Sequence, residues 1–270
     1  MRKGTWKPGG GKASGKGGQR RPQRERFRGP PSQDGPTILY GWHTVKAALE
    51  NPARRIRRLM LTDNAARRLA EDGVTLRVTP QIVRPDDIAA QLDPDAVHQG
   101  FFAEADALPA PDVEEITPQG VVLVLDQITD PHNVGAILRS AAAFAVSAIV
   151  TTARHSPEAT GVLAKSASGA LELVPMVTVQ NLARGLAALK ERGFQLVGLD
   201  SSGDADLATT QLSSPLALVL GAEGKGLRQL TRQTCDVVAQ LNLPGEIKSL
   251  NVSNAAALAL YVVTTRLQRG

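Results

Sequence analysis

Three short polar segments, each at the end of an apolar, strand-like run, hold the side chains best suited to chemistry. They are Asp126-Gln-Ile-Thr-Asp-Pro-His-Asn-Val-Gly135, Leu220-Gly-Ala-Glu-Gly-Lys-Gly226 and Leu241-Asn-Leu-Pro-Gly-Glu-Ile-Lys-Ser-Leu-Asn-Val-Ser253. Open α/β sheets bind their ligands beyond the carboxyl ends of the strands. We therefore expect the three segments to meet in one site.

The first segment offers an amide and a guanidinium. Asn133 is well placed to cap the helix that follows, through its side-chain oxygen. Arg139 follows six residues later, about two turns, and we expect it near the same face. An arginine inside an otherwise small and apolar helix needs a partner, and a phosphate suits its forked donors.

The second and third segments argue against several common enzyme classes. The spacing of a P-loop and the Gly-x-Gly-x-x-Gly of dinucleotide sites are both missing. Three glycines around Glu223 would instead let a ligand approach the backbone. Ser249 and Asn251 open the last helix, where they could cap it or bind a ligand. A hydrolase nucleophile is disfavoured because no Gly-x-Ser-x-Gly elbow exists.

Alternating strand and helix patterns position these segments. In the first part we predict strands at 38–41, 56–61 and 76–78 and helices at 42–49, 65–71 and 84–92, which together form a small α/β domain. In the second part we predict strands at 121–125, 148–152, 173–177, 194–199, 216–220 and 237–241, with helices at 134–144, 157–168, 181–192 and 255–267. The continuous apolar strands and the regular alternation predict a parallel, doubly wound sheet.

The basic character of the chain is concentrated at its start. Residues 1–35 hold ten Lys and Arg against two acids, a charge of +8; the total of +5 therefore leaves −3 for the rest. We expect this Gly/Arg-rich tail, 1–35, to be disordered and to bind polyanions; a solubility tail is the alternative. Residues 36–105 form the small domain, 106–119 a proline-containing linker and 120–270 the second domain.

A second group of basic residues lies in the small domain, beside a predicted strand: Arg54, Arg55, Arg57 and Arg58. Two interpretations stay open for this cluster. It is either a solvated turn or a surface that contacts RNA phosphates.

The three segments resemble the signature motifs of the SpoU/TrmH (SPOUT) family of S-adenosylmethionine-dependent RNA 2′-O-ribose methyltransferases. The resemblance covers about 150 residues in the right order. The third motif departs from the usual Ile-Pro-Met-x-Gly, since Leu241-Asn-Leu-Pro-Gly245 has its proline displaced by two positions. The sequence Leu39-Tyr-Gly-Trp-His-Thr-Val-Lys-Ala-Ala-Leu49 is similar to the RNA-binding domain of the branch that methylates a guanosine of large-subunit (23S) ribosomal RNA.

This resemblance implies a fold, a site and partners. The fold would be an α/β sheet with a C-terminal trefoil knot, in a homodimer that binds RNA. The catalytic set would be Asn133, Arg139, Glu223, Ser249 and Asn251. S-adenosylmethionine would lie among the backbone groups of Leu220, Gly221, Leu241, Leu243 and Leu250. Arg139 could act as a base or as a phosphate anchor, and the latter fits better because a guanidinium stays protonated in proteins.

Three other functions remain open: a transfer-RNA 2′-O-methyltransferase, a non-catalytic RNA-binding or ribosome-assembly protein, and an enzyme acting on a small nucleotide or amide. The single cysteine, the absence of an apolar signal and the lack of a membrane-length apolar run favour a reduced, cytoplasmic protein. No Cys/His cluster with zinc spacing occurs, so we expect no metal.

Overall fold

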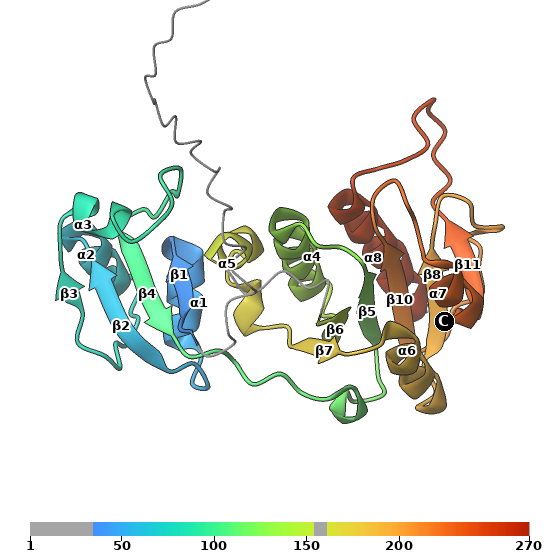
Figure 1. Ribbon diagram of the computed structural model, residues 1–270, viewed down its shortest axis with the longest axis horizontal. Coiled ribbons are helices and arrows are strands. Elements are labelled where there is room, and N and C mark those ends of the chain that lie inside the picture. Colours follow the sequence, from blue (N-terminus) through green and yellow to red (C-terminus); the bar gives the residue numbers. More distant parts are fainter. Residues whose placement is uncertain (1–34, 154–160, 270) are drawn as a thin grey trace, which may run out of the picture. The chain divides into compact units, whose positions relative to one another are not determined.

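The computed structural model describes residues 35–153 and 161–269. The basic tail, apart from Gly35, lies outside this range, so its predicted disorder stays a prediction. The body of the protein, Pro36–Gly270, is one compact unit that contains two sheets (Figure 1).

The first sheet is small and mixed, with the strand order β1-β4-β2-β3. Its elements are β1 (Thr37–Tyr40), α1 (Trp42–Glu50), β2 (Ile56–Leu61), α2 (Asp63–Glu71), β3 (Gln81–Ile82), α3 (Pro85–Ala89) and β4 (Phe101–Ala105). Strand β4 pairs antiparallel with both β1 and β2, whereas β3 pairs parallel with β2. The small α/β layer is therefore present, as predicted.

Two strand assignments in this sheet differ from the prediction. Residues 76–78 form no strand, and the edge strand is β3 instead, five residues further on. The central strand β4 was not predicted, because its short apolar run follows the loop residues Gln99 and Gly100 without an alternating pattern. Both residues have positive φ, 56° and 86°, and their turn aims Phe101 into the core. There its ring packs edge-on against Trp42, with the ring centroids 5.3 Å apart.

The second sheet has seven strands within the described residues, in the order β7-β6-β5-β10-β8-β11-β9. The strands are β5 (Val121–Asp126), β6 (Ala148–Thr152), β7 (Met176–Val179), β8 (Gln195–Leu199), β9 (Ala205–Asp206), β10 (Leu216–Gly221) and β11 (Val237–Gln240). Every neighbouring pair is parallel. The predicted parallel sheet is confirmed.

Helices cover both faces of this sheet (Figure 1). They are α4 (Pro131–Ala143), α5 (Gly161–Ala167), α6 (Leu182–Glu191), α7 (Gln229–Thr234) and α8 (Val252–Arg269), with 3₁₀ turns η1 (Val113–Glu115) and η2 (Ala170–Glu172). Leu123 and Leu125 of β5 pack with α4, α5 and α8, while Val122 and Val124 pack with α6 and η1. Alternate side chains of a strand point to opposite faces, so the continuous apolar run of β5 reflects burial on both sides.

Several boundaries of this domain differ from the prediction. Helix α5 is described from Gly161 onward, and its predicted start at 157 falls outside the described residues, so that boundary stays a prediction. Strand β7 begins three residues later than predicted, because Leu173 is exposed before the chain enters the sheet. The expected linker is partly integrated into the fold, since Val113 and Ile116 are buried in the core beneath α6. Strand β9 and helix α7 are short and were not predicted.

Candidate active site

The order of the strands creates a switch point between β5 and β10. From β5 the chain moves outward through β6 and β7, then crosses to β8 and returns to insert β10 beside β5. Ligands bind beyond the carboxyl ends of the strands at such a reversal. The first two polar segments follow β5 and β10, and the third follows β11 at the same edge of the sheet.

The first and third segments begin two helices whose first turns are bonded together. Asn251 accepts hydrogen bonds from the backbone N and the Oγ of Ser253, at 2.9 and 2.6 Å, and so caps α8. Its Nδ2 donates to Oδ1 of Asn133 at 2.9 Å. The two segments are 118 residues apart in sequence, so this bond shows that they meet in space.

The expected capping role of Asn133 is wrong. Asp130 caps α4 by accepting from the backbone N of His132 at 3.1 Å, and Pro131 takes the first helical position, where the missing N–H costs nothing. The side chain of Asn133 is therefore free of a local capping duty. This leaves its amide for Asn251 and for a ligand.

The second segment forms a tight turn at the end of β10. Ala222 and Gly226 form an antiparallel bridge, and Gly226 has a φ of 64°. A Cβ at Gly221 would overlap the backbone of Gly226. The glycines of this segment thus let the chain fold back on itself, and they keep side chains away from the end of the strand.

Two carboxylates hold the end of this turn from the strands on either side of β10. Asp200, after β8, accepts from the backbone N of Leu227 at 3.0 Å, and Asp126, at the end of β5, accepts from that of Arg228 at 3.1 Å. Burial acts to raise the pKa of Asp200, but the bonds from Leu227 and Ser202 and the charge of Arg232 outweigh it and hold that pKa below its ordinary value. Asp200 is thus held as an anionic acceptor for the loop.

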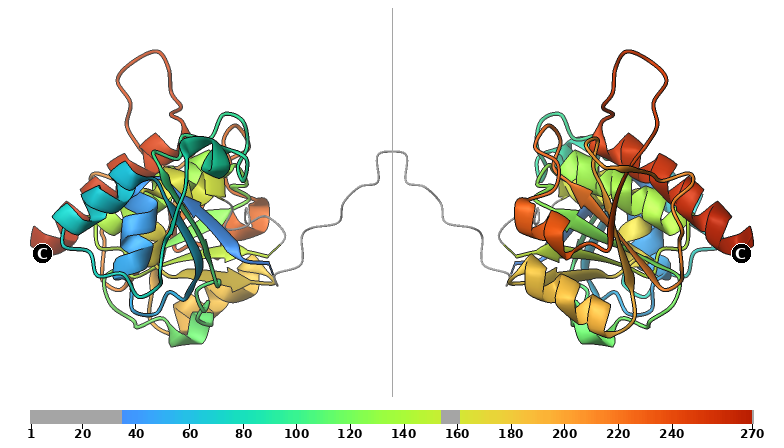
Figure 2. Two further views of the ribbon diagram at one scale, coloured as in Figure 1. Left: turned by 90° about the vertical axis from the view of Figure 1, so that its left-hand side faces the viewer. Right: turned by 90° about the vertical axis from the view of Figure 1, so that its right-hand side faces the viewer.

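The third segment, residues 241–251, stands out from the body as an extended loop (Figure 2). In the described chain, the backbone groups of residues 242–250 form no hydrogen bonds with other backbone groups. Lys248 donates to the carbonyl of Leu243 at 2.8 Å. Leu241, Leu243 and Leu250 are each partly buried, so the loop presents apolar side chains together with free amides and carbonyls.

The other predicted site residues are not joined to this pair. Six residues of α-helix turn through about 600°, which leaves Asn133 and Arg139 about 120° apart; the expectation of a shared face is wrong. Arg139, Glu223 and Ser249 are all exposed, and none of their side chains forms a hydrogen bond or ion pair with another described residue. Of the cofactor candidates, Leu220 is buried in the core, so only its backbone is available.

The four arginines of the small domain occupy different environments. Arg54 was expected at the surface, which is wrong: its side chain is 2% exposed and pairs with Glu172 at 2.6 Å. Arg57 and Arg58 pair with Asp106 and Glu104. Arg55 lies 3.6 Å from Asp106, but its side chain is 82% exposed, and it lines a cleft of about 290 Å³ together with Arg54 and Arg77. This edge of the domain therefore carries accessible positive charge without Arg54.

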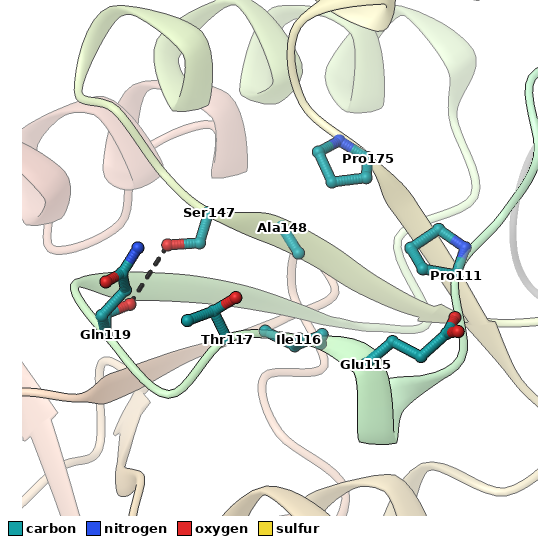
Figure 3. A pocket seen from close by; sticks show the side chains of 8 residues that line it. All are labelled: Pro111, Glu115, Ile116, Thr117, Gln119, Ser147, Ala148 and Pro175. Carbon is teal, nitrogen blue, oxygen red and sulfur yellow. Dashed lines mark hydrogen bonds between the residues drawn. The ribbon is translucent and has the colours of Figure 1, made fainter.

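A separate cleft of about 340 Å³ lies at the opposite edge of the large sheet. It is lined by Pro111, Glu115, Gln119, Ser147 and Pro175, at the amino ends of β5, β6 and β7 (Figure 3). Parallel sheets place their ligands at the carboxyl ends. This cleft therefore lies away from the converging segments.

Three residues that hold the turn after β10 were not predicted from the sequence: Asp126, Asp200 and Arg228. Asp126 was seen only as the start of a motif, and a strand-end aspartate gives no sign of its partner. The thiol of Cys235 is partly buried, and its pKa is raised to about 12, chiefly by this burial and by the adjacent Asp236, so little reactive thiolate is present at neutral pH. Among the residues that the structure describes, no helix could cross a bilayer and no three potential metal ligands cluster.

Both parts of the body match models of known protein families. The family model described as "SpoU rRNA Methylase family" matches residues 120–261, and that described as "RNA 2′-O ribose methyltransferase substrate binding" matches residues 38–111. The chain is 39% identical over 237 residues to the 23S rRNA (guanosine-2′-O-)-methyltransferase RlmB of Vibrio parahaemolyticus, covering 83% of this chain and 94% of that protein. It is 38% identical over 235 residues to RlmB of Ralstonia nicotianae, covering 83% and 93%.

The fold also matches solved structures. The SpoU methyltransferase AviRb from Streptomyces viridochromogenes, in complex with AdoMet, superposes with a TM-score of 0.74 at 25% identity, over 87% of this chain and 92% of that one. With matching motifs, domain models, close relatives and fold, this chain belongs to the SpoU rRNA methylase family.

Proposed function

We propose that this protein transfers the methyl group of S-adenosylmethionine to the 2′-oxygen of a guanosine in 23S rRNA. The observation that carries the proposal is the Asn251–Asn133 hydrogen bond at the carboxyl edge of the sheet, where the three motif segments follow β5, β10 and β11. The RlmB relatives share this body over more than nine tenths of their length.

The residues present fit the cofactor. The loop of residues 242–250 offers unpaired backbone donors and acceptors beside the partly buried Leu241, Leu243 and Leu250, as an adenosine requires. The turn after Gly221 keeps side chains clear of the end of β10. S-adenosylmethionine supplies an activated methyl on a neutral leaving group; the protein must position the ribose and stabilise the oxygen as it loses its proton.

The amides and the arginine have distinct tasks in this proposal. Asn133 and Asn251 orient the ribose from two helix starts, whose unpaired N–H groups favour negative charge nearby. Arg139 binds the phosphate and stabilises the developing alkoxide. Glu223 and Ser249 complete the set. These side chains form no hydrogen bond with the amide pair, so in this proposal they act on the RNA and the cofactor directly.

Quaternary structure and the finer fold belong to the same proposal. Leu258 and Tyr261, three residues apart on α8, share one face and are 46% and 59% exposed, which supports a homodimer through the last helix, with Arg139 acting across it. We also propose the trefoil knot in the C-terminal region, an RNA-binding domain at 36–105 and a methyltransferase domain at 120–270. Because the proposed substrate is ribosomal RNA, we also propose a cytoplasmic location.

The decisive experiment is methyl transfer to defined RNA. Purified protein should transfer label from S-adenosylmethionine to unmodified 23S rRNA transcript, and mapping should find one 2′-O-methylguanosine. If only transfer RNA were methylated, the substrate would be transfer RNA and not 23S rRNA. Failure to bind S-adenosylmethionine would refute the proposed methyltransferase activity.

A further inference from the structure

Helix α5 connects the small sheet to the proposed catalytic helix. It packs against α4 on one side and against β1 and α1 on the other. At the first contact a Cβ on Gly135 would lie 2.8 Å from the carbonyl oxygen of Leu163, so the motif glycine allows the two helices to touch. At the second contact Thr44 donates to the carbonyl of Ala164 at 3.1 Å.

A row of polar side chains follows this connection. It begins at the Asn251–Asn133 pair and continues through the neighbouring His132, whose Nδ1 lies 3.3 Å from Oγ of Ser166. Next to Ser166, Lys165 donates from Nζ to Oε1 of Gln99 at 3.2 Å. Steps between sequence neighbours thus link the proposed site to the loop before β4.

Lys165 is the cation in this row, and the partner of its ammonium is a neutral amide. No carboxylate of the described residues lies within ion-pairing distance of its ammonium. Its environment is partly buried, and this desolvation holds its pKa below the ordinary 10.5. The charge of Lys165 in turn helps to lower the pKa of His98, so this histidine supplies no counter-charge. A partly desolvated cation whose hydrogen-bond partner is a neutral amide keeps a charge that is not compensated, and an anionic ligand would offset it.

We infer that Lys165 binds a backbone phosphate of the substrate RNA, between the target nucleotide and the stretch held by the small domain. The inference rests on the proposed function and adds to it a specific positioning contact. It is argued from geometry: Lys165 bonds to Gln99 of the small domain, and the next residue, Ser166, contacts His132 beside Asn133, so the ammonium lies between the two ends that such an RNA strand would join. Serine and imidazole groups at Ser166 and His132 can donate to the same strand.

Salt dependence of RNA binding tests this contact directly. Each phosphate neutralised contributes about 0.9 to the slope of log affinity against log salt for a duplex, and about 0.7 for a single strand. We expect Lys165→Gln to lower the slope for 23S rRNA transcript by about that amount and to weaken binding several-fold at low salt. Lys165→Arg, which keeps the charge, should restore the slope of the unmodified protein.

Matched controls separate this contact from general effects of charge and folding. Lys190→Gln removes an equal charge from α6, on the other face of the sheet, and should leave the slope unchanged. In methyl transfer, Lys165→Gln should raise KM for RNA with little change in kcat, and S-adenosylmethionine affinity should stay the same. If the Gln variant does not fold, Lys165→Met, which keeps the aliphatic stem, carries the test.

The inference and the proposed function can fail separately. An unchanged salt slope in folded Lys165→Gln, or an equal loss in Lys190→Gln, would overturn the phosphate contact while methylation by the unmodified protein still stood. Absence of methylation would overturn the function, and the binding slopes would still decide the role of Lys165.

Discussion

Arg228 donates from Nε to the carboxylate of Asp126 at 2.6 Å, and this carboxylate is fully buried at the end of β5. The second oxygen of the same carboxylate accepts from the backbone N of Arg228. The glycine turn after β10 is thereby fastened to the strand that carries the first motif. The Asp126–Arg228 pair therefore joins the first and second motifs, which lie on either side of the switch point.

Removing Arg228 should loosen the connection between these two motifs. In Arg228→Met the buried Asp126 loses its counter-charge, and we expect a loss of about 2 kcal/mol in unfolding free energy, less than for a fully buried pair because Arg228 is partly exposed. S-adenosylmethionine affinity should fall as well, since the turn is no longer fixed. Urea unfolding and calorimetric titration measure the two effects. Lys190→Met, which breaks a surface pair with Asp236, should cost under about 1 kcal/mol and leave cofactor affinity intact.

The amide pair can be separated from helix capping by substitution. Asn251→Ala removes both the cap of α8 and the bond to Asn133, so we expect a loss of about 1 kcal/mol together with loss of methylation. Asn251→Asp keeps the cap but cannot donate. It should retain stability yet remain inactive, as judged by thermal unfolding and methyl transfer. An active Asp variant would show that the bond to Asn133 is dispensable.

Arg139 should matter for chemistry and not for folding. It is exposed on α4, so Arg139→Ala should change the unfolding free energy by less than about 0.5 kcal/mol. We expect methyl transfer to be abolished with S-adenosylmethionine affinity retained. Arg184→Ala, which alters an exposed arginine of α6 on the other face of the sheet, provides the control. Normal turnover by Arg139→Ala would remove this residue from the site.

The buried pair between Arg54 and Glu172 should stabilise the contact between the small sheet and η2. Nε and Nη2 of Arg54 both donate to Glu172, and Asn51 donates to the same carboxylate at 2.7 Å. Glu172→Gln leaves a buried guanidinium without compensation, and we expect a loss of roughly 3–5 kcal/mol. The double replacement Arg54→Met, Glu172→Leu should recover part of that loss. Denaturant unfolding of the three proteins decides the matter.

His98 should make stability depend on pH near neutrality. Burial, and then repulsion from Lys165, hold its pKa below the ordinary 6.5. Between the lowered pKa and 6.5 the unfolded chain binds more protons than the folded chain, so the unfolding free energy falls as pH drops through that window. His98→Gln should flatten this part of the profile, while at pH 8 the histidine contributes no such slope. A profile identical to that of the unmodified protein would contradict the prediction.

The periodicity of the sequence was sufficient to predict the central architecture. Strands β2 and β6 fall at the predicted residues and the parallel sheet is confirmed, because a strand buried on both faces is an unbroken apolar run. The short strand β4 escaped, since its direction depends on two positive-φ loop residues and its pairing is entirely long-range. Short edge strands such as β9 have too few residues to show a period.

The candidate site, too, could be predicted only in part from the sequence. The motifs located the three segments, and Asn133 and Asn251 do meet. The sequence could not show whether Asp130 or Asn133 caps the helix, because both residue types are good caps and they lie three positions apart. Burial of Arg54 was also hidden, since its partner Glu172 is 118 residues away. Local sequence shows what a side chain can do, and the distant partner decides which of these roles it takes.

The clamp of Arg54 on Glu172 has a consequence for recognition. It holds the accessible edge of the small sheet at a fixed distance from the amide pair. Under the proposed function, an RNA can bind the small sheet and place a guanosine at the amide pair only if the two parts of the RNA are separated by this distance. Selection of one nucleotide among thousands would then rest on a length within folded RNA, without any need to read the neighbouring bases.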